Sequence, residues 1–152
     1  MLKCRPFGLQ DWEVLLDLAN QAVPFAPAEN AEWFDYRKSF DDTALVRRHY
    51  LALENGLPVG YGSLEQQGDN PHRLRIYVVC SPANLLGEVG DLLYEQLLRV
   101  GRELDVSQLW AREFQEDAAA EKFFTSKGFV VTDRFTLPDY RPMVSYALEL
   151  TD

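Results

Sequence analysis

The sequence predicts an α/β fold with a mixed sheet, and three observations support this prediction. Over 152 residues, segments with the two-residue period of strands are interrupted by segments with the period of amphipathic helices. The run Ile76-Tyr-Val-Val-Cys80 is apolar on both faces, which is typical of a central strand. Asn55-Gly56 joins two apolar runs, which is a strong signal of a β-hairpin. We therefore expect a single domain over residues 1–152, with helices on both faces of the sheet.

The N-terminal half is predicted to form one strand, two helices and the hairpin. Residues 2–7 are expected to be a strand, and residues 9–23 a helix with an apolar stripe at helical spacing. That stripe consists of Trp12, Leu15, Leu16, Ala19 and Val23. A second, shorter helix is expected over 29–40, and the hairpin strands over 49–54 and 57–64.

The C-terminal half is predicted to alternate strands and helices. Gly128 is expected to end the last helix with a positive φ. The whole chain then has the order β-α-α-β-β-β-α-β-α-β-β. The elements expected here are strands over 73–80, 107–114, 129–135 and 143–150, and helices over 88–104 and 117–127.

Composition and charge exclude several classes of function. The net charge of −9 argues against a nucleic-acid surface, which is usually basic. No apolar run reaches the length of a membrane span, and no apolar signal segment follows Met1, so we expect a cytoplasmic protein. Cys4 and Cys80 lack the spacing of metal or redox sites, so we expect free thiols and no metal.

Three stretches carry a resemblance to a known family. They are the hairpin over 51–61, the run 76–82 followed by Gly90-Asp-Leu-Leu93, and the segment 117–129 with its closing Gly-Phe. Their order and spacing resemble the GNAT superfamily of N-acetyltransferases, over nearly the whole chain. The resemblance implies a GNAT-like fold and an enzyme that transfers an acetyl group from acetyl-CoA to a primary amine. The acceptor would be a small molecule or a peptide, and its amine would attack the thioester directly.

The resemblance also implies where acetyl-CoA would bind. Members of the family splay their fourth and fifth strands and lay the pantetheine chain in the gap. The turn after Pro82 would then offer N–H groups to the pyrophosphate at a helix N-terminus. The cofactor-binding residues implied by position are Val78, Val79, Cys80, Leu85, Leu86, Gly87, Glu88, Val89, Gly90, Asp117, Ala120, Phe123 and Phe124.

The sequence departs from the family pattern in this turn. The usual base or amide, glycine, and glycine or alanine fall on Leu85, Glu88 and Gly90, so only Gly90 matches. Glu88 would place a like charge beside a pyrophosphate. Gly87 is expected to supply the missing backbone freedom one position away. The alternative is an ordinary capped turn that binds nothing.

Acid–base chemistry is less clearly marked. Phe124 stands where the family often has the tyrosine that protonates the leaving thiolate, and it is also simply explained as a core residue. Arg75 stands near the family's glutamate, so we expect Glu113 to be the general base, with Glu65 and His72 as other candidates. The expected acceptor-binding residues are Trp33, Tyr36, Glu65 and Tyr140, and the acids around them favour a cationic acceptor.

Other interpretations stay open. The segments 41–50, 111–113 and 132–135 resemble a GNAT branch in which two such domains often share one chain. The chain would then be one half of a longer protein, or pair as a homodimer. A second hypothesis is a catalytically degenerate GNAT-like domain that binds CoA or a protein. A third is an unrelated α+β binding domain.

Overall fold

The computed structural model describes residues 1–22, 44–138 and 141–150, which form a seven-stranded mixed sheet with the strand order β1-β2-β3-β4-β5-β7-β6. The β4–β5 pair is parallel, and the other neighbouring pairs are antiparallel. This confirms the predicted mixed sheet. The strands are β1 (Leu2–Pro6), β2 (Arg47–Glu54), β3 (Leu57–Glu65), β4 (Arg73–Val79), β5 (Gln108–Phe114), β6 (Val130–Thr136) and β7 (Pro142–Glu149).

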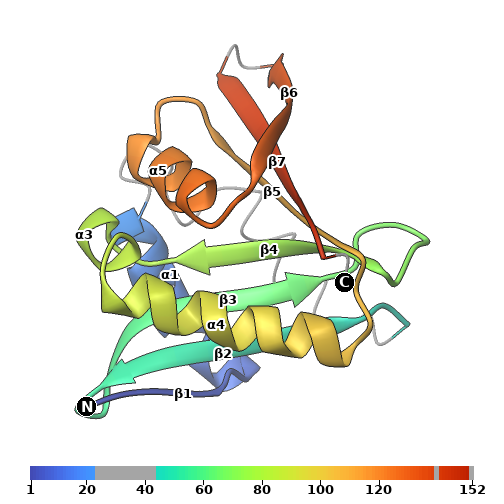
Figure 1. Cartoon of the computed structure of the whole chain (residues 1–152). Helices are drawn as coiled ribbons and strands as arrows, with labels where there is room; N and C mark the ends of the chain where they lie inside the picture. Colours follow the sequence, from blue (N-terminus) through green and yellow to red (C-terminus); the bar gives the residue numbers. More distant parts are fainter. Residues whose placement is uncertain (23–43, 139–140, 151–152) are drawn as a thin grey trace.

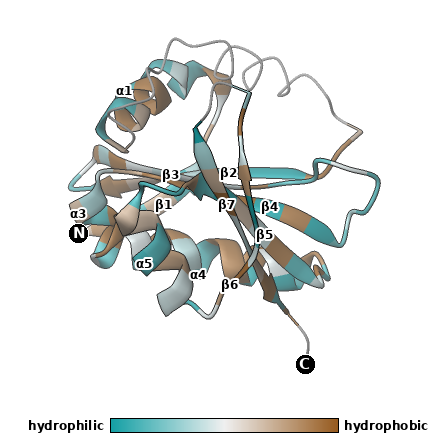
Figure 2. Cartoon of the chain, turned by 90° about the horizontal axis from the view of Figure 1, so that it is seen from above, coloured by the Kyte–Doolittle hydropathy of each residue, from teal (hydrophilic) through white to brown (hydrophobic). Residues whose placement is uncertain are grey.

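Helices cover both faces of the sheet, as predicted. Figure 2 shows α1 on one face and α4 and α5 on the other. The second predicted helix, over 29–40, lies outside the described residues. Within the described part of the chain, no helix is long and apolar enough to cross a membrane. The helices are the 3-10 turn η1 (Leu9–Asp11), α1 (Trp12–Ala22), α3 (Pro82–Leu85), α4 (Glu88–Glu103) and α5 (Ala118–Ser126).

The sheet separates two hydrophobic clusters. The larger cluster packs α4 and α5 against one face, with Leu93 and Leu97 of α4 fully buried. The smaller cluster packs α1 against the other face through Leu15 and Leu18, which meet Tyr61 and Val79. Leu18 is buried, whereas Leu16, which we placed in the apolar stripe, is only partly buried. The stripe of α1 is therefore rotated slightly from the predicted one.

Local turn chemistry matches the sequence. Asn55 and Gly56 both have positive φ, of 51° and 84°, so the hairpin turn is the predicted one. Gly128 follows α5 with a φ of 94°, which confirms the predicted end of that helix. The other predicted strands and helices in the described residues have bounds within two residues of the observed ones, whereas α1 begins three residues late because the 3-10 turn η1 takes up Leu9–Asp11.

The two central parallel strands separate partway along their length. The paired positions are Arg73 with Gln108, Leu74 with Leu109, and Arg75 with Trp110. Beyond Arg75 and Trp110 the strands no longer pair, and Figure 1 shows them diverging, with α3 and α5 at the open end. We call the unpaired parts of the two strands, residues 76–79 and 111–114, the fork. The register thus confirms the separation that the sequence resemblance implied.

Candidate functional site

The fork exposes the edge of β4 that faced β5 before the strands diverged. Backbone N–H and C=O groups along an unpaired strand edge are available to an extended ligand. Val78 and Val79 lie within this part of β4, and Cys80 follows directly. Burial raises the pKa of the Cys80 thiol to about 12, so this thiol is not a nucleophile at neutral pH. Any role of the three residues in binding would therefore come from their main chain.

The turn after β4 differs from an open anion cradle. It forms the short helix α3, which the sequence analysis missed, with Ser81 as its N-cap. The N–H groups of Leu85, Leu86 and Gly87 donate to the carbonyl oxygens of Ser81, Pro82 and Asn84 at 2.8–3.2 Å. In this conformation these three amides are occupied. These N–H groups are therefore not available to donate hydrogen bonds to a phosphate.

The first turn of α4 supplies the remaining amides. Glu88, Val89 and Gly90 occupy this turn, where N–H groups have no partner within the helix. Gly90 is needed for packing, because a β-carbon on it would lie 2.0 Å from the carbonyl oxygen of Leu85. Gly87 has an extended φ of −115°, so the predicted need for glycine flexibility there is wrong. Any residue can adopt that backbone conformation.

The charges around this turn are partly balanced. Leu85, at the family's basic position, is 7% exposed and packs in the core, so a charged side chain would not fit there. Glu88 is exposed, whereas Asp91 Oδ1 forms an ion pair with Lys127 Nζ at 2.5 Å. The Lys127 ammonium also lies 5.4 Å from the centre of the Tyr94 ring. Glu88 is thus the unpaired acid of the turn among the described residues.

Glu113 lies on the β5 arm of the fork and has a strongly perturbed acidity. Burial raises the pKa of its carboxyl to about 8, with the Arg75 guanidinium opposing the shift and Asp117 adding to it. It is partly buried and has no hydrogen-bond partner among the described residues. A carboxyl poised near neutral pH at the fork suits a general base.

The α5 residues of the predicted site are largely structural in this conformation. Phe124 is 2% exposed and is surrounded by three aromatic rings, those of Phe123, Phe129 and Tyr146, at centroid distances of 5.1–5.5 Å. Asp117 caps α5 by accepting a hydrogen bond from the Ala120 N–H at 3.0 Å. Ala120 and Phe123 are buried in the same cluster. Contact of these residues with a ligand stays a prediction.

The other predicted acid–base and acceptor residues fall in different places. Glu65 is fully buried, and its carboxylate contacts Arg47 Nη1 at 2.6 Å and Ser63 Oγ at 3.2 Å, which favours a structural role. His72 precedes β4 at its paired end, away from the fork, and contacts the Asp105 carbonyl oxygen. Trp33, Tyr36 and Tyr140 lie outside the described residues.

Two features near the fork were not predicted from the sequence. Three arginines of β4 and β5, Arg73, Arg75 and Arg112, gather around Trp110. The signal that could have revealed them is the two-residue spacing of Arg73 and Arg75 on β4 and of Trp110 and Arg112 on β5, because residues two apart share a face. The second feature is Tyr146 of β7, a buried phenol whose pKa is raised by burial and then by Glu121 and Glu113.

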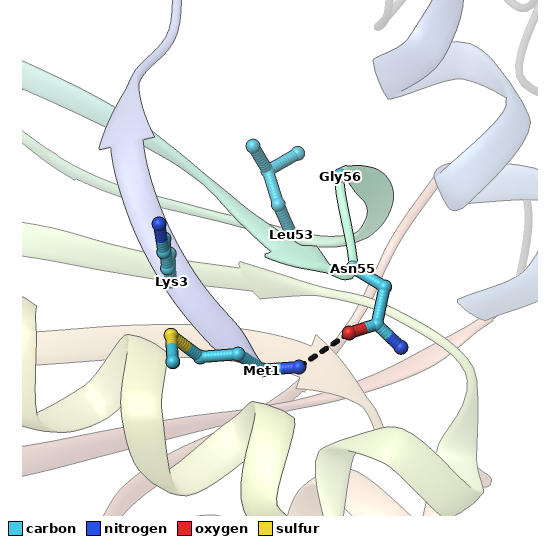
Figure 3. A pocket seen from close by; sticks show the side chains of 5 residues that line it. All are labelled: Met1, Lys3, Leu53, Asn55 and Gly56. Atoms are coloured by element: carbon cyan, nitrogen blue, oxygen red, sulfur yellow. Dashed lines mark hydrogen bonds between the residues drawn. The ribbon is translucent and has the colours of Figure 1, made fainter.

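A surface pocket of about 360 Å³ lies elsewhere, at the β1 edge of the sheet. It is lined by Met1, Lys3, Leu53, Asn55 and Gly56, and Figure 3 shows the Met1 amino group donating to Asn55 Oδ1, at 2.5 Å. Two strands separate this edge from β4. No carboxyl side chain lines this pocket, in contrast to the fork with its Glu113. In the described residues, no group of three His, Cys, Asp or Glu side chains is placed to hold a metal ion.

Comparison with solved structures shows that the protein shares its fold with acetyltransferases. A protein assigned to the GNAT family from Desulfovibrio desulfuricans matches with a TM-score of 0.81 and 14% identity, over 99% of this chain and 100% of that chain. The ribosomal-protein-S18-alanine N-acetyltransferase of Escherichia coli matches with a TM-score of 0.76 and 16% identity, over 100% and 96% of the two chains. A protein from Salmonella typhimurium, described as an acetyltransferase and solved with acetyl-CoA, matches with a TM-score of 0.74 and 18% identity, over 99% and 95%.

Sequence comparison adds no closer relative. No family model matches the chain, and no curated protein matches it. The structural matches establish that the chain has the fold of the GNAT acetyltransferases, as its sequence predicted. They contradict the third hypothesis, an unrelated α+β binding domain, as far as its fold is concerned.

Proposed function

We propose that this protein is an N-acetyltransferase that transfers the acetyl group of acetyl-CoA to a primary amine. The observation that carries this proposal is the fork, where β4 and β5 stop pairing after Arg75 and Trp110. It supports a site in which the pantetheine chain lies along the free edge of β4. The shared fold with acetyltransferases, one of them solved with acetyl-CoA, supports the choice of donor.

The residues at the fork fit this donor in part. The unpaired edge of β4 at Val78 and Val79 offers main-chain partners for the pantetheine amides. The first-turn amides of Glu88, Val89 and Gly90 suit a phosphate at a helix N-terminus. The Glu88 carboxylate opposes that anion, and the apolar Leu85 stands where the family usually has a base or an amide. We therefore expect binding that is weaker than in a turn with a base.

The reaction proceeds by direct attack. Glu113, once ionised, takes a proton from the acceptor ammonium, directly or through a water molecule. The free amine then attacks the thioester carbonyl, and the backbone N–H near Val79 stabilises the oxyanion that forms. Collapse of this intermediate breaks the carbon–sulfur bond and releases CoA as a thiolate. The thiolate takes up the second proton, which the nitrogen loses after the attack, and Glu113 releases the first proton to solvent. The products are an N-acetyl amide, CoA thiol and one proton.

A second candidate is a domain that binds CoA or a protein without catalysis. It is favoured by the position of Phe124, which is enclosed by aromatic rings where the family often has an acid. The backbone N–H groups at the end of α3, which already donate to carbonyl oxygens, favour the same candidate. The CoA-binding form of the second candidate shares the fork with the first candidate, and the two differ in turnover.

The test has a binding step and a turnover step. Calorimetry with acetyl-CoA measures binding, and release of free thiol in the presence of a panel of primary amines measures transfer. The proposal predicts saturable binding and amine-dependent release that Glu113→Gln strongly reduces and the exposed control Glu116→Gln preserves. Binding without turnover on any amine would favour the second candidate. No binding of acetyl-CoA or CoA would refute the transferase and the CoA-binding form of the second candidate.

A further inference from the structure

A cluster of arginines flanks the closed end of the fork on the α1 face of the sheet. We define the arginine cluster as Arg73, Arg75 and Arg112. Their guanidinium carbons lie 4.8, 5.2 and 5.6 Å from the centre of the Trp110 ring. Arg75 also lies 4.3 Å from the ring centre of Tyr77, whose side chain packs toward the α1 cluster. This concentration of positive charge is unexpected in a chain with a net charge of −9.

The carboxylates near the arginine cluster act on it from a distance and not through ion pairs. Among the described residues, none of its three guanidinium groups has an ion-pair partner within 4.0 Å. Glu65 is paired in register with Arg75, but its oxygens contact Arg47 and Ser63 instead. The pKa of Arg112 is lowered by burial and then by Arg75, while Tyr77 and Asp133 oppose that shift. The cluster therefore carries a net positive charge.

Arg75 retains an unused donor within this cluster. Its Nε is buried and has no hydrogen-bond partner, and its Nη2 makes a long contact of 3.4 Å to the Arg112 carbonyl oxygen. Leaving a buried donor unsatisfied is costly, and a charged donor more so. Guanidinium groups bind carboxylates and phosphates in bidentate geometry. An oxyanion from a ligand would satisfy the Arg75 donor.

The position of the cluster links it to the reaction. Arg75 and Trp110 form the last pair before the fork, and Arg112 and Tyr77 lie just beyond them. Glu113 follows Arg112 on β5 and therefore lies on the opposite face of the sheet. Its charge still acts on Arg75 and Tyr77. The proposed base and the arginine cluster therefore meet at the fork from the two faces of the sheet.

We propose that the acceptor is a small amine that also carries an oxyanion, either a carboxylate or a phosphate. Arg75 and Arg112 hold the oxyanion on the α1 face, and the amine of the same molecule reaches Glu113 in the fork. This inference rests on the proposed N-acetyltransferase function and names its substrate class. It replaces the cationic acceptor that the acidic residues of the sequence suggested.

Matched acceptor pairs test the inference in the thiol-release assay. Each of the common amino acids is compared with its own amide, and 2-aminoethyl phosphate with ethanolamine, so that the carboxylate and phosphate arms are separate. We expect kcat/KM to favour the anionic member of at least one pair by about 10- to 100-fold, the size of one charged hydrogen-bonded contact. Arg112→Gln should remove most of that preference by raising the KM of the anionic member of the pair. Arg102→Gln, an exposed arginine in the last turn of α4, is the control.

A measurement without turnover separates this inference from the proposed function. Inorganic phosphate and acetate are titrated into the whole protein while the arginine Nε–Hε NMR signals are followed. Arg75→Gln and Arg112→Gln assign the signals, and the exposed Arg112 keeps the test valid if Arg75→Gln misfolds. Shifts of these signals without turnover on any amine would support the anion site and refute the transferase. If the protein turns over and prefers acceptors without an oxyanion, and if the arginine NMR signals do not shift, the anion site alone is overturned.

Discussion

The carbonyl oxygen of Leu85 lies directly against Gly90, so that a β-carbon at position 90 would be only 2.0 Å from it. This contact joins the end of α3 to the first turn of α4, where the proposed phosphate site lies. Backbone cannot move aside as a flexible side chain does. We predict that Gly90→Ala lowers the free energy of unfolding by about 1–3 kcal/mol or more, measured by urea denaturation.

Gly101→Ala provides the matched control in the same helix. Its β-carbon would meet its nearest neighbour, Leu64 Cδ1, at an ordinary 3.7 Å. Because alanine is the better helix former, this variant should be neutral or more stable by up to about 1 kcal/mol. Equal effects of the two substitutions would contradict the close packing of α3 on α4.

Glu88 opposes the binding of a phosphate at the α4 N-terminus. Removing its charge with Glu88→Gln should tighten the calorimetric Kd for acetyl-CoA by about threefold to tenfold, and the gain should shrink as salt is added. The variant should also lose roughly 0.3–1 kcal/mol of stability, because an acid near a helix N-terminus is favourable. Glu95→Gln, which removes an exposed charge from the middle of α4, should leave the Kd unchanged. A weaker Kd in Glu88→Gln would place the phosphates elsewhere.

Glu113 should control the pH dependence of the reaction. Its pKa of about 8 means that the carboxyl is largely protonated at neutral pH, so the rate should rise with pH and level off above about 8. Glu113→Gln should lower kcat by about 10²- to 10⁴-fold and remove this rise. The readout is the pH profile of thiol release for both proteins. An unchanged profile in the variant would assign the base to another group.

The same carboxyl should make stability depend on pH even without substrate. Its folded pKa of about 8 lies above the ordinary value of 4.5, so unfolding releases a proton between these two values. The free energy of unfolding should therefore fall as pH rises from about 4.5 to 8. The difference between wild type and Glu113→Gln, measured by urea denaturation at pH 5.5 and 8, should shift in favour of the variant at the higher pH. A constant difference would show that Glu113 is not perturbed.

Replacing Phe124 by the tyrosine that the family often has should not raise the rate of the reaction. The ring is enclosed by Phe123, Phe129 and Tyr146, so a hydroxyl would be buried among apolar groups. We predict that Phe124→Tyr costs about 1–3 kcal/mol in stability and gives no gain in kcat. Phe124→Leu, which removes the ring without adding a polar atom, separates loss of packing from the cost of the hydroxyl. A rate increase in Phe124→Tyr would mean that this position faces the reacting thiol.

Features set by local chemistry were predictable from the sequence. Asn55-Gly56 and Gly128 required positive φ because of their own residue types, and the structure has it at all three positions. The apolar face of α4 followed from its helical spacing. The two-residue spacing of Arg73, Arg75 and the aromatic Tyr77 was equally visible, but its meaning depended on Trp110, which lies on another strand.

Features set by tertiary contacts were not predictable. Helix α3 spans only four residues, too few for a periodic pattern, and its formation occupies the amides that a sequence motif would assign to a ligand. Leu85 stands where the family usually has a base or an amide, yet it belongs to the larger hydrophobic cluster, on the side of the sheet that α4 covers. The pKa of Glu113 depends on burial at the fork and on Arg75 and Asp117, which no local pattern reports.

The most direct test of the central claim is amide hydrogen exchange of the protein with and without acetyl-CoA. If the donor lies along the fork, amides of residues 76–80 and of the first turn of α4 should become protected, while the edge at Met1 and Asn55 stays unchanged. Saturating acetyl-CoA that protects neither segment, or that protects the β1 edge instead, would contradict the account.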